Sequence, residues 1–111
     1  MICDPWAVVV VPFPFTDTRG VKRRPAVVLS ATEFNRHGHS VLVMITSSTH
    51  AQWPGDVEIR DLAAAGLKAS CIVRLKIFTL DNRLLLRRIG GLAEDDRERL
   101  VGEVRGALAG L

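Results

Sequence analysis

Residues 6–11 read WAVVVV, an apolar run in which four valines follow one another. A short apolar run rich in β-branched residues, without polar alternation, is typical of a strand that is buried on both faces. The run ends at PFPFTDTRG (residues 12–20), where two prolines and Gly20 predict an irregular loop. This stretch therefore predicts a β-rich core with its first strand at residues 6–11.

Five further stretches that follow this run in the sequence have the composition of strands and are separated by turn residues. They are residues 25–30, 40–46, 55–60, 70–78 and 84–89. Between them, residues 31–40 predict a loop or a single helical turn. Asp61 predicts the capped start of another short helical turn over residues 61–67.

The period of the apolar residues changes near the C-terminal end of the sequence. From Glu94 onward the apolar spacing is helical, and acidic residues occupy the first turn, where they favour the positive end of the helix dipole. The residues expected on one helix face are Leu100, Val101, Val104 and Leu108. Strands followed by a terminal amphipathic helix predict a single β-rich α+β domain over residues 1–111.

Composition and charge narrow the function classes. The chain is 48% hydrophobic, with a mean hydropathy of +0.19, which indicates either self-association as a homodimer or simply a valine-rich core. Lys and Arg total 15 against 12 acidic residues. The cations gather in two clusters, an early one (Arg19, Lys22, Arg23, Arg24) and a late one (Arg83, Arg87, Arg88). Such segregation suggests a polyanionic partner, with ordinary solvated charge as the alternative.

Several chemistries lack their sequence signals. The lone Cys3 and Cys71 and the absence of an HExxH motif argue against a metal site. No phosphate-binding glycine loop is visible, so no cofactor is expected. The longest apolar run is too short for a membrane span, and we expect a cytoplasmic protein.

Three polar side chains stand beside predicted strands and could meet a phosphate. Arg24 precedes Pro25, which biases it toward extended geometry at a strand entry, where a guanidinium can bind a phosphate bidentately. Thr46 ends a strand, and Arg74 lies inside an apolar one. The alternatives are a solvated cation for Arg24, a turn-capping hydroxyl for Thr46 and an outward-facing Arg74.

Aromatic and histidine side chains leave further alternatives open. Phe13, Phe15 and Trp53 flank these polar residues and could stack on bases of a single strand, although both phenylalanines could equally pack into the core. The histidines, which are His37, His39 and His50, are expected in loops at the solvated surface.

In order and spacing, several segments resemble the MazF/PemK family over roughly residues 5–110. They are VVVVPFPFTDTRGVKRRPAVVLS, FNRHG, VLVMITSS, GDVEI, GLKAS and VRLKIFTLDNRLLLRRIGGL. The resemblance implies a small SH3-like β-barrel that forms homodimers. It also implies the toxin of a type II toxin–antitoxin pair, an endoribonuclease that cuts single-stranded RNA without metal and is bound by a cognate antitoxin.

The resemblance also implies site residues. Arg24, Thr46 and Arg74 stand where the family keeps catalytic residues, and Ser47 matches a small polar neighbour. The remaining RNA-binding expectations are Asp17, Arg19, Lys22 and Arg23. Attack of a 2′-OH on phosphorus needs fixed donors for the charge that develops, and also a proton acceptor. A guanidinium is a poor acceptor because its pKa exceeds about 12.

One departure from the family leaves that acceptor unidentified. Many relatives carry an acidic residue shortly after the position of Arg74, where this chain reads Leu75-Lys76. Asp17 is a substitute candidate, and His37 and His39 are weaker ones. Two rival functions therefore stay open, namely a CcdB-like gyrase-inhibiting toxin and an inactive module that only binds single-stranded RNA.

Overall fold

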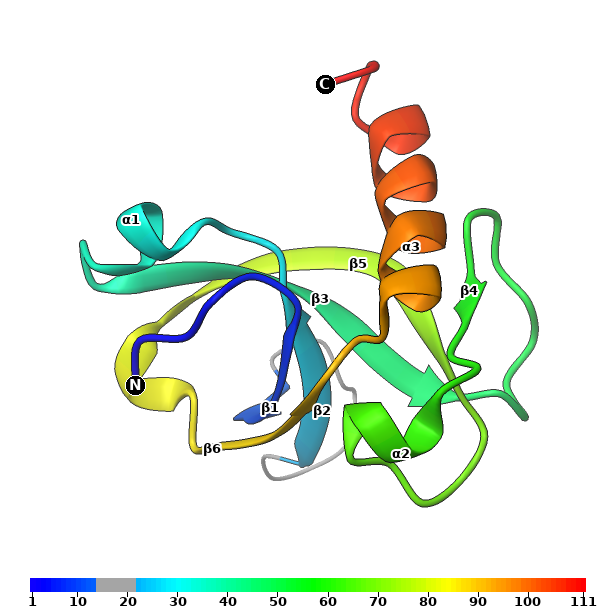
Figure 1. Cartoon of the computed structure of the whole chain (residues 1–111), viewed down its shortest axis with the longest axis horizontal. Coiled ribbons are helices and arrows are strands. Elements are labelled where there is room, and N and C mark those ends of the chain that lie inside the picture. Colours follow the sequence, from blue (N-terminus) through cyan, green and yellow to red (C-terminus); the bar gives the residue numbers. More distant parts are fainter. Residues whose placement is uncertain (14–21) are drawn as a thin grey trace.

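The computed structural model describes residues 1–13 and 22–111, and within them six strands form one antiparallel sheet. The strands are β1 (Ala7–Pro12), β2 (Arg23–Val28), β3 (His39–Ser47), β4 (Val57–Glu58), β5 (Cys71–Asp81) and β6 (Arg87–Gly91). Their spatial order is β4-β5-β3-β2-β1-β6. The long strands β3 and β5 curve, so that the sheet curls into an open half-barrel (Figure 1).

Helices are short except at the C-terminal end. They are α1 (Thr32–Asn35), α2 (Leu62–Ala65), the 3₁₀ turn η1 (Asn82–Leu84) and α3 (Glu94–Ala107). The Asp61 carboxylate accepts a hydrogen bond from Ala64 N at 3.0 Å, which confirms the predicted cap of the helical turn. The predicted β-rich α+β fold with a C-terminal helix is confirmed (Figure 1).

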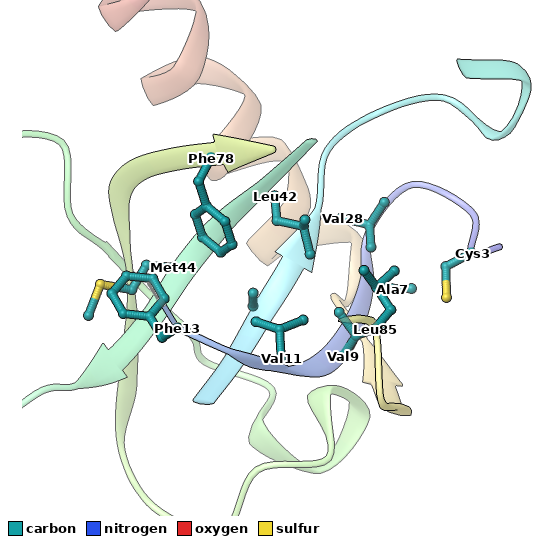
Figure 2. Packing of buried hydrophobic residues seen from close by; sticks show 11 residues of the cluster. Cys3, Ala7, Val9, Val11, Phe13, Val28, Leu42, Met44, Phe78 and Leu85 are labelled. Carbon is teal, nitrogen blue, oxygen red and sulfur yellow. The ribbon is translucent and has the colours of Figure 1, made fainter. Parts of the chain in front are cut away.

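Apolar residues fill both faces of the sheet, because successive strand residues alternate between its two sides. Val9, Val11, Ala26, Leu42 and Phe78 belong to the cluster inside the curl, which Figure 2 shows from close by. A second cluster lies on the other face; it contains Val8, Val27, Val43, Ile45, Val73 and Leu100 of α3. The valine run of β1 thus serves two cores, as its unbroken hydrophobicity predicts.

Strand boundaries differ most from the prediction in β2, β4, β5 and β6. Arg24 lies inside β2, opposite Val11, rather than before the strand. β4 has only two residues, and β5 continues to Asp81. The segment predicted as the sixth strand begins with η1, so β6 starts three residues late, at Arg87. Asp81 causes this last difference, because its side chain accepts a hydrogen bond from Arg83 N and starts the 3₁₀ turn.

The N-terminal end of α3 is fixed to the rest of the domain by a buried carboxylate. Asp96 is 1% exposed and accepts hydrogen bonds from the backbone N–H groups of Arg60 and Asp61, each at 3.0 Å. Arg99, one turn further along α3, also pairs with it. Asp96 therefore ties the helix to the segment between β4 and α2.

The predicted apolar face of α3 is only partly in the core. Leu100 is fully buried, and Val104 packs against the same cluster. Val101, Val104 and Leu108 line a groove of about 310 Å³ beside Trp6 and Leu29, and Leu108 is 40% exposed. No helix in the described part of the chain is both long and apolar enough to cross a membrane.

Candidate functional site

Arg24 and Thr46 come to the same level of the sheet from adjacent strands. β2 and β3 are antiparallel, with Ala26 paired to Met44. Extending this register by two further residues along each strand places Arg24 level with Thr46. Because side chains two residues apart share a face, both belong to the face of Ala26 and Met44, inside the curl. Residues that are 22 positions apart in the sequence thus lie on one face of adjacent strands, each two residues beyond the Ala26–Met44 pair.

The guanidinium of Arg24 stands at the edge of the apolar core. Arg24 is half-buried, and among residues 1–13 and 22–111 its Nε is buried without a hydrogen-bond acceptor. A buried donor of this kind is costly to leave without a partner. Arg24 as a whole is only half-buried, so part of the side chain stays accessible to a phosphate, which a guanidinium binds with charge-assisted hydrogen bonds.

A histidine joins this pair, and sequence reasoning missed it. Thr46 is 3% exposed, and its Oγ1 lies 2.8 Å from Nδ1 of His50. The chain turns back directly after β3, where His50 N donates to Ser47 O at 3.3 Å. The sequence does carry a signal for this contact. Thr46 and His50 are separated by Ser47, Ser48 and Thr49, which are residue types that favour tight turns.

Arg74 is buried beside the same loop and is held by several acceptors. Its Nη2 donates to Asp56 Oδ2 at 2.9 Å and to Ala51 O at 2.5 Å, and its Nε donates to Asp56 Oδ1 at 3.2 Å. The guanidinium also lies 4.8 Å from the centre of the Trp53 ring. Arg74 is paired with Met44 in the sheet, and Met44 lies two residues before Thr46 in β3. The sequence did not predict Asp56 as its partner.

Asp56 is therefore held as a carboxylate. Burial alone would raise its pKa, but the hydrogen bonds from Arg74 and from Trp53 N, together with the charge of Arg74, lower the pKa below the ordinary value. The N–H of Trp53 donates to Asp56 Oδ2 at 2.8 Å. A carboxylate with a lowered pKa and these donors is a weak proton acceptor.

A groove of about 470 Å³ runs beside these groups, between the loop after β3, strand β4 and the start of β5. Its lining is polar for the most part: Ser48, His50, Gln52, Asp56, Glu58, Ile59, Ser70, Cys71 and Ile72. Burial raises the pKa of the Cys71 thiol, so this side chain stays neutral. The groove thus offers an imidazole, the hydroxyls of Ser48 and Ser70 and a paired carboxylate to a ligand.

Two other predicted RNA-binding residues, Arg23 and Ser47, alternate away from the face of Arg24 and Thr46. Arg23 follows Lys22 in the chain and is exposed, and it lies on the face opposite Arg24 because neighbouring strand residues alternate. There it lines a second groove, of about 560 Å³, with Lys68 and Arg87. Ser47 is half-buried, and its Oγ lies 2.9 Å from Thr49 Oγ1 within the turn.

Some expectations fall elsewhere. Phe15, Asp17 and Arg19 lie outside the described residues. Phe13 is 2% exposed and packs edge-on against Phe78 at 5.3 Å, which settles its alternatives in favour of the core. His37 lies in the turn before β3 and His39 begins the strand, and seven residues of strand put His39 roughly 23 Å from Thr46.

These observations define a class: a small half-barrel with a C-terminal helix and an arginine–hydroxyl pair at one end of its sheet. Residues 4–108 match the family of PemK-like, MazF-like toxins of type II toxin–antitoxin systems, and the chain belongs to this family. No curated protein matches the sequence significantly.

Solved structures support the same fold. The MazE–MazF complex from Deinococcus radiodurans superposes with a TM-score of 0.77 at 22% identity over 98% of both chains. The Mycobacterium tuberculosis toxin MazF-mt6 gives 0.74 at 19% identity, over 93% of this chain and 96% of that one. An endoribonuclease in complex with its cognate antitoxin, from a mycobacterial species, gives 0.74 at 19% identity, covering 97% and 94%.

Proposed function

We propose that this protein is the toxin of a type II toxin–antitoxin pair and acts as a metal-independent, sequence-selective endoribonuclease on single-stranded RNA such as messenger RNA. The observation that carries the proposal is the placement of Arg24 level with Thr46 on one face of the sheet. The family membership supports it, and so does the similarity to a mycobacterial endoribonuclease that was solved in complex with its cognate antitoxin.

The chemistry follows from this pair. The 2′-OH of one nucleotide attacks the adjacent phosphorus, the bond to the 5′ oxygen breaks, and the products are a 2′,3′-cyclic phosphate and a 5′-OH. Negative charge grows on the equatorial phosphate oxygens during this step. Arg24 and the Thr46 hydroxyl are the donors for that charge, and their strands fix both before the reaction starts.

Arg74 has a narrower place in the proposal. Asp56 and Ala51 take the hydrogen bonds of its Nε and Nη2 and so orient the loop that carries His50. A direct contact between Arg74 and the scissile phosphate stays a prediction. This contact predicts a lower kcat for an Arg74→Lys variant that keeps the stability and the RNA affinity of the wild type.

The partners in this proposal are RNA, an antitoxin and a second copy of the chain. An acidic antitoxin segment competes with RNA for the same cations, because both present negative charge to Arg24 and its neighbours. The apolar groove beside α3 and the exposed Leu108 and Leu111 support a homodimer. Sedimentation equilibrium at micromolar concentration gives twice the chain mass if the dimer forms.

The deciding experiment uses purified protein, a long unstructured RNA and EDTA, followed by mapping of the cut ends. Discrete cuts with 5′-hydroxyl ends in the wild type, lost in Arg24→Ala and Thr46→Val, are the expected result. Intact RNA with retained, salt-dependent RNA binding would favour a binding module. Intact RNA without binding, together with inhibition of gyrase, would favour a CcdB-like toxin.

A further inference from the structure

We propose that His50 is the general base of the cleavage, accepting the 2′-OH proton on its Nε2 while Thr46 holds its Nδ1. The inference rests on the proposed function and identifies the proton acceptor that it lacks. It starts from the contact between Thr46 Oγ1 and His50 Nδ1.

The contact orients the imidazole on a rigid support. Thr46 is 3% exposed and is paired with Ile72 of β5, so its hydroxyl is fixed by the strand. His50 itself is exposed, and the turn closed by its backbone N–H and Ser47 O brings its ring back over the strand end. A base needs this combination of a fixed ring and access to substrate.

One tautomer serves both residues. When Nδ1 carries the hydrogen and donates to Thr46 Oγ1, the lone pair of Nε2 is available, and within the described residues Nε2 has no hydrogen-bond partner. The hydroxyl hydrogen of Thr46 is then left for a phosphate oxygen. The base and the charge-stabilising donor thereby lie next to one another. This geometry suits the attack of a 2′-OH on the adjacent phosphorus, because the base must reach the hydroxyl while the donor reaches a phosphate oxygen.

The other ionisable groups of the groove serve less well. Asp56 is paired with Arg74, and its pKa is lowered, so it accepts a proton weakly at neutral pH. Cys71 is a neutral thiol because burial raises its pKa. Glu58, an exposed side chain on β4, is the rival base, but no hydrogen bond within the described residues joins it to Thr46.

The step balances with water as co-reactant. As the 2′-oxygen bonds to phosphorus, its proton passes to the Nε2 lone pair and His50 becomes an imidazolium. The phosphorus–5′-oxygen bond breaks, and the leaving oxygen takes a proton from water to give the 5′-OH. The hydroxide formed removes the proton from Nε2, which returns the neutral histidine.

The test measures single-turnover cleavage in EDTA, between pH 5 and 8, of an RNA that carries the mapped site. For the wild type, the rate should fall toward the acid end of this range, because a protonated imidazole has no lone pair to accept the 2′-OH proton. His50→Asn keeps an amide near the position of Nδ1 and removes Nε2. Its rate should fall about 10²- to 10⁴-fold and lose that pH dependence.

Three controls separate catalysis from structure. Affinity for the same RNA with a 2′-O-methyl group at the cut site should change less than threefold in His50→Asn. His39→Asn, an exposed histidine at the far end of β3, should keep the wild-type rate and profile. Added imidazole should restore part of the rate to His50→Ala, which a structural role for His50 does not predict.

The outcomes distinguish the two proposals. If the wild type cuts RNA and the rate of His50→Asn is within threefold of it, with the same pH profile, the role of His50 is overturned. The endoribonuclease proposal then still stands. Loss of the pH dependence in Glu58→Gln instead of His50→Asn assigns the base to Glu58 and also overturns it. A wild type that cuts no RNA overturns both proposals.

Discussion

Arg74 and Asp56 form a buried ion pair, in which Nη2 of the arginine lies 2.9 Å from Oδ2 of the aspartate. The two side chains are only 7% and 3% exposed. The pair joins the first half of β5 to the residue that precedes β4. It therefore holds the loop after β3, with His50, against the edge of the sheet.

Removing the carboxylate should destabilise the protein strongly. Asp56→Ala leaves the guanidinium of Arg74 buried without its partner, and breaking a buried pair in this way costs about 3–5 kcal/mol. Urea unfolding monitored by Trp fluorescence measures the loss. The control is Glu33→Gln, which removes the exposed Arg36–Glu33 pair and should change the free energy of unfolding by less than about 1 kcal/mol. An Asp56→Ala cost no larger than that of the control would contradict the role of the pair.

The same pair should make the stability depend on acid pH. The pKa of Asp56 is lower in the folded protein than the ordinary 3.8. The unfolded chain therefore binds the proton first as the pH falls, and the stabilisation is complete above about pH 4 and lost below it. Unfolding free energies between pH 6 and pH 2 measure this decline. The pKa of Asp81 is also lowered, to about 2, so the difference between wild type and Asp56→Ala isolates the buried pair.

Two neighbouring arginines should have separate effects on RNA. Arg24→Ala should reduce kcat by about 10²-fold or more, because it removes a donor to the developing phosphate charge. Arg23→Ala, on the opposite face, should leave kcat within about threefold and at most lower the salt dependence of RNA binding by one unit of slope. Cleavage rates and binding at several salt concentrations measure both. Equal losses of kcat in the two variants would refute the assignment to one face.

Gly66 should tolerate no side chain. It ends α2 with φ of +74°, and an added Cβ would lie 2.0 Å from the carbonyl oxygen of Ile89 in β6. Gly66→Ala should therefore cost well over 1 kcal/mol. Gly102→Ala is the matched change, since a Cβ there meets nothing within 4 Å inside α3. It should raise stability by about 0.5–1 kcal/mol. Thermal unfolding of both variants checks the opposite signs.

Two adjacent aspartates of α3 should differ in importance. Asp96→Ala removes the acceptor for two backbone N–H groups and should cost about 2–6 kcal/mol, at about 1–3 kcal/mol for each donor left unsatisfied. Asp95→Ala breaks only exposed pairs with Arg60 and Arg99 and should cost less than about 1 kcal/mol. Urea unfolding distinguishes the two. Similar costs would mean that Asp96 does not anchor the helix.

The sequence by itself determined the elements whose signal is local. The valine runs of β1 and β2, the cap at Asp61 and the helical period after Glu94 each depend on neighbouring residues, and all were predicted correctly. Strand ends were less predictable, because a side-chain hydrogen bond such as the one from Arg83 N to Asp81 shifts them. The family was also recognisable, since its motifs follow one another in order along nearly the whole chain.

Only the tertiary structure decided how the site is assembled. Strand register brings Arg24 level with Thr46, and no local pattern encodes a pairing between residues so far apart. The turn after β3 brings His50 to Thr46, although its loop sequence predicts a solvated histidine. Arg74 gives the same result, because its burial depends on Asp56, a partner that comes from another segment. Local propensity fixes the elements, whereas long-range pairing and the cost of burying charge fix which side chains meet.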